Sequence, residues 1–196
     1  MGAISSDADN FIVWSDAGYG DRDGDMLAEV PVSRIPDAKS PRLVVNALKA
    51  DDPNPASSCF GIRNDARPFA DEAYKLLNGS SKIFISKPQT AGGLGARKAN
   101  GAKSYVMLHG SDVDATRFWG ELDGAMLEAV NIGNVPQQFS GAVFTGCCWG
   151  ALAVQTKAAS YVSGMPLGVR TPGTSIALSF LHAGAKAFVG CTGTHY

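Results

Sequence analysis

The chain has 196 residues, of which 45 % are hydrophobic and 18 % are charged, and its formal net charge is −1. These values fit one globular domain with a substantial core, and they give no electrostatic reason to bind nucleic acid or an anionic membrane. No apolar run is long enough to span a bilayer, and the polar, acidic N-terminus is unlike a signal peptide. We therefore expect a single domain over residues 1–196 in the cytoplasm, with neither nucleic acid nor membrane as a partner.

Local patterns predict strands and helices that alternate along the chain. The strands expected are 11–14, 82–86, 104–108, 142–144, 166–170 and 187–191, with a short extended segment at 29–36. The helices expected are 40–50, 66–78, 121–130, 151–160 and 174–183, and in the second of these Phe69, Ala73, Leu76 and Leu77 form the predicted core face. This alternation indicates an α/β fold whose mostly parallel sheet is covered on both faces.

Two loops are rich in residues that bind ions. Residues 15–25 carry Asp21, Asp23 and Asp25 at alternate positions, as in the start of a calcium-binding EF-hand loop, but Val32 stands where that loop has glutamate. We favour a solvated turn here and keep a structural calcium ion as the alternative; no other cofactor and no catalytic metal is expected. The second loop contains Gly92–Gly95, a weak match to a phosphate-binding loop.

The segment 141–152 contains two adjacent cysteines, which are the main candidates for a reactive site in this sequence. A short apolar strand runs into Cys147 and Cys148, and a predicted helix follows, whose N-terminus would favour a thiolate. A second strand, 104–108, ends at His109-Gly110, which lies 38 positions before Cys147. Adjacent parallel strands would bring these two points to one edge of the sheet, where ligands bind in α/β proteins. An imidazole and a thiol together supply a base and a nucleophile for acyl transfer.

Two motifs have the form found in a known clan of cysteine peptidases. They are Tyr105-Val-Met-Leu-His109-Gly110 and Thr145-Gly-Cys147-Cys-Trp-Gly150, and in this order they resemble the caspase-like clan. The N-terminal segments Trp14-Ser-Asp-Ala-Gly-Tyr19 and Glu29-Val-Pro-Val-Ser-Arg34 resemble the gingipain-type family within that clan, although Ser33 stands where the family has glycine. Gly146–Leu152 also looks like the corresponding segment of separases.

The resemblance implies a caspase-like three-layer α/β/α sandwich and a cysteine endopeptidase. It makes Cys147 the nucleophile, His109 the acid–base group, and the backbone N–H groups of Gly110 and Cys147 the oxyanion site. Cys148 and Trp149 are implied to contact the substrate beside the nucleophile. The choice of Cys147 over Cys148 comes from the resemblance alone. The other histidines, His182 and His195, receive less weight, although His195 follows the last predicted strand and could line the pocket.

The same resemblance implies a preference for Arg or Lys at the P1 position of the substrate. Asp25 stands four residues before Glu29. In arginine-specific gingipains, the carboxylate at this position binds the P1 side chain of the substrate. With that preference, Arg97, Lys98 and Lys103 become expected sites of self-cleavage.

Two other interpretations remain open at this point. The domain could be a catalytically silent caspase-like scaffold or regulatory domain, or a flavodoxin-like domain that holds phosphate at Gly92–Gly95. A peptide or protein substrate is the partner expected, with an oligomer or a regulatory partner as an addition. In the family a first core strand precedes the segment at Trp14, so the sequence is expected to be either the whole domain or a piece of a longer chain.

Overall fold

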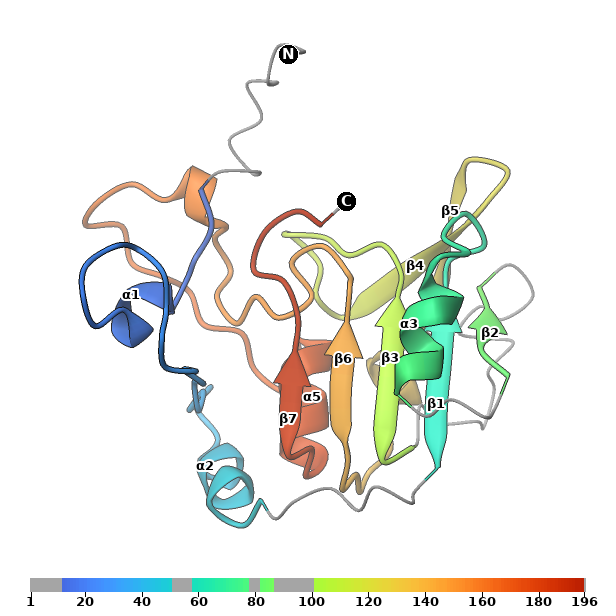
Figure 1. Cartoon of the computed structure of the whole chain (residues 1–196), viewed down its shortest axis with the longest axis horizontal. Helices are drawn as coiled ribbons and strands as arrows, with labels where there is room; N and C mark the ends of the chain where they lie inside the picture. Colours follow the sequence, from blue (N-terminus) through green and yellow to red (C-terminus); the bar gives the residue numbers. More distant parts are fainter. Residues whose placement is uncertain (1–11, 51–57, 78–81, 87–100, 196) are drawn as a thin grey trace.

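The structure is a computed structural model that describes residues 12–50, 58–77, 82–86 and 101–195 (Figure 1). Its central sheet has five strands in the order β2-β1-β3-β6-β7, and every neighbouring pair is parallel. The strands are β1 (Cys59–Arg63), β2 (Phe84–Ile85), β3 (Lys103–Met107), β6 (Ala142–Thr145) and β7 (Ala187–Val189). The α/β class with a mostly parallel sheet is thereby confirmed.

Four α-helices accompany this sheet in the described part of the chain. They are α1 (Ala17–Gly20), α2 (Pro41–Leu48), α3 (Ala70–Leu76) and α5 (Ile176–Ala183). Pro41 opens α2 at a position where a missing N–H costs nothing, as the sequence predicts. The hydroxyl of Ser175 caps the start of α5, and Gly184 ends it in the left-handed region at φ 114°.

Helices cover both faces of the sheet, as expected from its buried strands. Successive residues of β3 point to opposite faces, so Tyr105 packs with Tyr74 of α3 while Val106 joins the core that contains Phe180 of α5 (Figure 1). Gly61 of β1 makes room for the Tyr74 ring, because a Cβ there would lie 2.5 Å from a ring carbon. Helix α2 packs on α5 through Leu43. The larger core thus lies between the sheet and α5.

The helix predicted at 121–130 is wrong. The chain there forms an antiparallel hairpin of β4 (Arg117–Leu122) and β5 (Ala125–Asn131). Asp123 and Gly124 make its two-residue turn with φ values of 50° and 77°, the left-handed geometry that Asp-Gly favours in tight hairpins. Phe118, Ala129 and Val130 are buried in the larger core, so packing of the hairpin outweighs the helical propensity of the segment.

The helix predicted at 151–160 is also wrong. Only a 3₁₀ turn at Ala158–Ser160 (η3) forms there; a second 3₁₀ turn, η2, covers Ile132–Asn134. The backbone of 153–155 instead pairs with 168–170: the N–H of Gln155 donates to Gly168, and that of Arg170 donates to Ala153. These bonds use backbone groups that a helix would need, so tertiary pairing decides the conformation. The short strand predicted at 166–170 is reduced to the bridge between Val154 and Val169.

Three smaller predictions also differ from the structure. Residues 12–14 of the first predicted strand are not in a sheet, and strand β1 was not predicted at all. Helix α3 begins at Ala70 rather than 66, because Asn64 accepts a hydrogen bond from the N–H of Ala66 and holds a turn before the helix. Phe69 and Leu76, predicted on the core face, are 57 % and 88 % exposed. The other two predicted residues, Ala73 and Leu77, are partly buried against the cluster that contains Ala70 and Tyr74.

Candidate active site

His109 lies two residues beyond the end of β3 and is held by the hairpin. Its N–H donates to the carbonyl of Trp119 at 2.8 Å, and the N–H of Trp119 donates back to its carbonyl at 2.9 Å. The backbone of His109 is therefore fixed between the central sheet and β4. The imidazole retains 24 % of its surface, which leaves it accessible at the carboxyl end of the sheet.

Glu121 is the side-chain partner of His109. Its Oε2 atom lies 3.2 Å from Nε2 of His109, and it follows Trp119 by two residues, so both project to the same side of β4. A carboxylate only accepts hydrogen bonds, so the neutral imidazole carries its proton on Nε2. Nδ1 is then the nitrogen left to exchange a proton with a substrate or a thiol.

Cys147 follows β6 and is completely buried. Its side chain belongs to the larger core, its Sγ atom lies 3.7 Å from the carbonyl oxygen of Val106, and its N–H donates to Oγ1 of Thr145 at 3.1 Å. Burial raises the pKa of the Cys147 thiol to about 12. The thiolate-favouring helix terminus expected from the sequence is missing, because residues 151–157 are not helical.

Cys148 is the second thiol at this edge and keeps 9 % of its surface. Its Sγ atom accepts the N–H of His195 at 3.3 Å and donates to the carbonyl of the same residue at 3.3 Å. The His195 ring is close by, because a Cβ at Gly146 would lie 3.2 Å from its Nε2 atom. The structure thus places His195 at the site, while His182 lies on α5.

The loops that follow β3 and β6 touch at Gly110. A side chain at this position would collide with the carbonyl oxygen of Cys148, so only glycine lets the two backbones come together. This contact brings His109-Gly110 and Cys147-Cys148 to one edge of the sheet, as the sequence predicts. Of the two N–H groups proposed to hold an oxyanion, that of Cys147 is already bonded to Thr145.

Arg170 forms hydrogen bonds to both of these loops. It is 4 % exposed, and its guanidinium donates to the carbonyl of Leu152, at 2.9 Å, and to that of Asp112. Leu152 belongs to the segment after the cysteines and Asp112 to the segment after His109. Burial lowers the pKa of Arg170. One side chain therefore ties the thiol loop to the imidazole loop.

Trp149 directly follows the two cysteines, and Lys157 lies over its ring. Trp149 adopts a left-handed backbone at φ 50°, and its N–H donates to the carbonyl of Gly193 at 2.8 Å. The ammonium of Lys157 lies 5.6 Å from the centre of the Trp149 ring and 3.4 Å from a carboxylate oxygen of Asp112. The indole is thus fixed at the edge where the resemblance expects a substrate contact.

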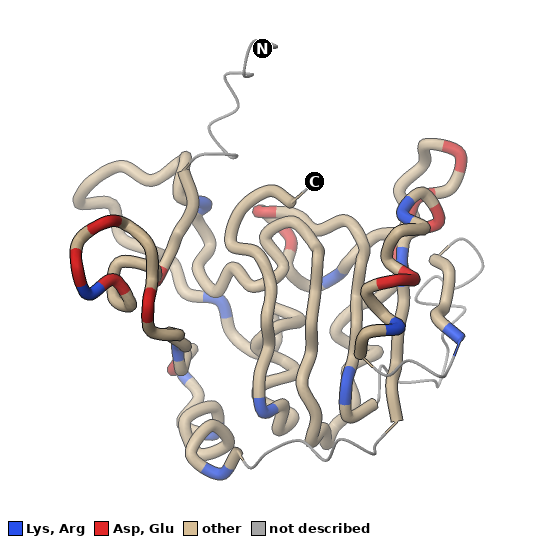
Figure 2. Tube along the Cα trace, viewed as in Figure 1, with Lys and Arg blue, Asp and Glu red and all other residues tan. Residues whose placement is uncertain are grey.

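Asp25 lies apart from these residues. It is exposed on the loop after α1, beyond β7 from the ends of β3 and β6, where acidic residues gather (Figures 1 and 2). The structure therefore does not bring Asp25 to the imidazole and the thiols. Instead, its carboxylate accepts the N–H of Leu27 at 2.8 Å.

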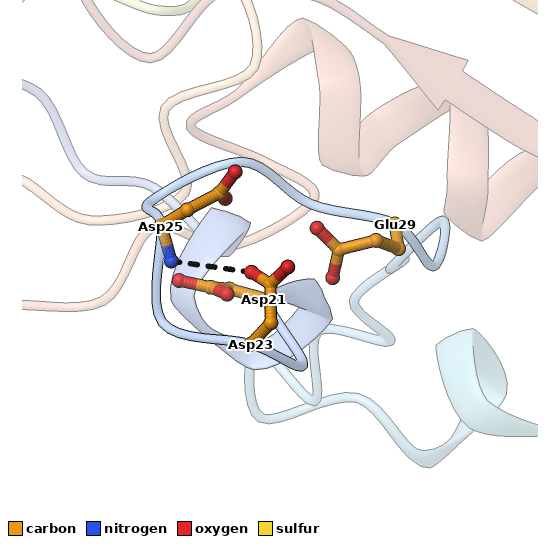
Figure 3. A group of neighbouring side chains, drawn as sticks. All are labelled: Asp21, Asp23, Asp25 and Glu29. Atoms are coloured by element: carbon orange, nitrogen blue, oxygen red, sulfur yellow. Dashed lines mark hydrogen bonds between the residues drawn. The ribbon is translucent and has the colours of Figure 1, made fainter.

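Four carboxylates meet in this loop. Ligand oxygens of Asp21, Asp23, Asp25 and Glu29 lie within 4.8 Å of one another (Figure 3). Backbone N–H groups of Gly24 and Met26 donate to Asp21 and lower its pKa. Oxygen ligands of this kind suit calcium, and the same hydrogen bonds also account for a solvated turn, so both interpretations from the sequence stand.

Sequence reasoning missed Glu121 and Arg170, and it gave little weight to His195, which the structure joins to Cys148. Glu121 was assigned to a helix, although the Asp123-Gly124 pair is a hairpin signal that would have placed it on a strand beside His109. Nothing in the local sequence marks Arg170, because its partners are carbonyl groups 18 and 58 residues away.

No protein-family model matches the chain, and comparison with curated proteins finds no match either. Among the described residues, no helix has both the length and the apolar character needed to cross a membrane. The likeness to the caspase-like clan therefore remains a resemblance of motifs.

Proposed function

We propose that this protein is a cysteine endopeptidase with a caspase-like α/β/α fold. The observation that carries the proposal is the contact between the His109-Gly110 and Cys147-Cys148 segments at the ends of adjacent parallel strands. It is supported by the partly exposed imidazole of His109 and its carboxylate partner Glu121, an arrangement suited to proton transfer.

The chemistry proposed is acyl transfer through a thioester. His109 takes the thiol proton as sulfur adds to the scissile carbonyl, and the carbonyl oxygen becomes an oxyanion near the N–H of Gly110. The C–N bond then breaks, and the imidazolium gives its proton to the leaving amine. Water hydrolyses the thioester in the second half, with His109 again removing and returning a proton, so the free thiol is restored.

Cleavage after Arg or Lys is part of the proposal and comes from the resemblance. Self-cleavage follows from it at Arg97 and Lys98, which lie outside the described residues. Lys103 is a poorer site, because it is the first residue of β3 and pairs with both β1 and β6. Intact mass after incubation should therefore show a cut after 97 or 98 that disappears in His109→Ala.

The silent scaffold is the alternative that a specific observation favours. Cys147 has no exposed surface, and burial raises the pKa of its thiol to about 12. Both properties are typical of a structural cysteine. The flavodoxin-like alternative depends on Gly92–Gly95, which lie outside the described residues.

Turnover of fluorogenic peptides with Arg, Lys, Asp or Leu at P1 separates these proposals. Wild type is compared with His109→Ala and with the double variant Cys147→Ala/Cys148→Ala. The peptidase predicts cleavage in wild type that falls by at least about a hundredfold in both variants. Equal, background-level signals from all three folded proteins would reject the peptidase and favour the scaffold.

A further inference from the structure

The register of the sheet separates the two cysteines. Strands β3 and β6 pair Val106 with Thr145, and the N–H of Gly146 donates to the carbonyl of Val106 at 2.9 Å, which extends the ladder beyond β6. Counting on from the pair Val106 and Thr145 sets residue 108 level with 147 and residue 109 level with 148. Level residues of parallel neighbours lie on the same side of a sheet. On this count, which runs past the last paired residues into the turn at Cys148, Cys148 and not Cys147 is level with His109.

Burial agrees with this register. Leu108 and Cys147 are both fully buried and both belong to the larger core on the α5 face of the sheet. At the carboxyl edge, the His109 side chain keeps 24 % of its surface, and Cys148 is buried but keeps 9 %. To reach a substrate, the Cys147 thiol would have to leave a packed core, whereas the buried Cys148 lies nearer to solvent.

A third observation joins Cys148 to the imidazole loop. The close approach that requires glycine at position 110 is made to the backbone of Cys148, with its carbonyl carbon and its nitrogen 3.1 and 3.3 Å from the place of a Cβ. Gly110, the residue after His109, is thus in contact with Cys148. This backbone contact agrees with the register in placing Cys148 against the loop that carries His109.

We infer that Cys148 is the reacting thiol of the proposed peptidase and that Cys147 is a core residue that supports the end of β6. The inference rests on the proposed function and reverses the assignment implied by the resemblance. In it, Nδ1 of His109 takes the proton of Cys148 Sγ as the S–C bond to the substrate carbonyl forms, and His109 later returns a proton to the leaving amine.

The bonds of Cys148 define what must change during the reaction. Its Sγ–H donates to the carbonyl of His195, and this bond has to break before the proton can pass to His109. The N–H of His195 also donates to the sulfur, and this bond can persist while the thiol reacts. Substrate binding therefore has to compete with the His195 carbonyl for the thiol.

The first test uses iodoacetamide on the folded wild type at neutral pH, without any substrate. Tryptic mapping with fragment ions distinguishes the adjacent cysteines, and unfolded protein gives the reference rate for each. We expect carbamidomethylation of Cys148 at least about tenfold faster than that of Cys147, and a tenfold slower Cys148 reaction in His109→Ala. Faster labelling of Cys147 would overturn the inference. Because the readout needs no turnover, it stands even if no peptide is cleaved.

The second test compares peptide cleavage by Cys147→Ala, Cys147→Ser and Cys148→Ala, each checked for a native circular dichroism spectrum. We expect Cys148→Ala to lose at least about a hundredfold in kcat/KM, while a folded Cys147 variant keeps more than a tenth of wild-type activity. Retained cleavage in Cys148→Ala with loss in a folded Cys147→Ser would overturn the assignment and keep the peptidase. Labelling of Cys148 with no cleavage by wild type would instead count against the peptidase alone.

Discussion

The edge that carries His109 and the cysteines differs from the acidic loop after α1 in what holds each in place. The first is fixed by long-range bonds: His109 pairs with Trp119, Gly110 touches Cys148, and Arg170 bridges both loops. The second is fixed by its own short-range bonds, in which aspartates accept N–H groups two to five residues away. A substitution at the edge should therefore affect the whole domain, and one in the loop should stay local.

The largest effect is expected from Arg170→Met. The substitution leaves the carbonyls of Leu152 and Asp112 without their buried donor, which should cost about 2–4 kcal/mol of unfolding free energy and most of the peptidase activity. Urea unfolding measures the first and fluorogenic turnover the second. Arg117→Met is the matched control, since that side chain is 44 % exposed and forms surface ion pairs with Asp114 and Glu128. Equal losses of unfolding free energy and of turnover in both variants would show that the hydrogen bonds of Arg170 to the two loops do not stabilise the site.

Glu121→Gln should come next and should act on activity rather than stability. A glutamine amide can donate to Nε2 as well as accept from it, so the imidazole is no longer held in one tautomer, and kcat should fall about tenfold with KM nearly unchanged. Nitrogen NMR of the His109 ring reports the tautomer directly. The control is Glu128→Gln, which removes a carboxylate from the partner strand of the same hairpin. An unchanged ring spectrum in Glu121→Gln would show that Glu121 does not position His109.

Gly124→Ala tests whether the turn between β4 and β5 needs a left-handed backbone at position 124. A Cβ in the left-handed region at φ 77° should cost about 1 kcal/mol of stability and reduce turnover by no more than its effect on the folded fraction. Gly173→Ala is the control, because only Thr171 lies near its Cβ position and its backbone is not left-handed. Equal melting temperatures for the two variants would contradict the turn assignment.

Asp25→Asn should have the smallest effect. Since Asp25 lies beyond β7 and bonds within its own loop, we expect stability within about 0.5 kcal/mol of wild type and an unchanged ratio of cleavage after Arg to cleavage after Leu. The ratio is measured on matched fluorogenic peptides. A selective loss of cleavage after Arg and Lys would show that the Asp25 carboxylate does bind the P1 side chain.

Local sequence predicted the elements whose conformation is decided locally. Strands β3 and β6, and helices α2 and α5, follow from short apolar runs and from caps such as Pro41, Ser175 and Gly184. The failures at 121–130 and 151–160 have one cause: both segments have helical propensity, and both are drawn into backbone pairing with distant residues. An Asp-Gly turn signal was available for the first and none for the second.

The site divides in the same way. His109-Gly110 and Cys147-Cys148 were predictable as strand ends, because parallel neighbours bring their carboxyl ends to one edge. Which cysteine is level with His109 was not predictable, since a one-residue change of register exchanges the two faces of a strand. Glu121 and Arg170 were missed because their partners are set by the hairpin and by the loops, not by neighbouring residues.

We propose that an imidazole and a thiol form one reactive pair at the edge of this sheet. Incubating the protein with a peptidyl chloromethyl ketone that carries Arg at P1, and then measuring intact mass, tests this pair. We predict one adduct per chain in wild type, formed at least about a hundredfold more slowly in His109→Ala. No adduct in folded wild-type protein, or the same rate in both proteins, would show that His109 and a thiol do not form a reactive pair.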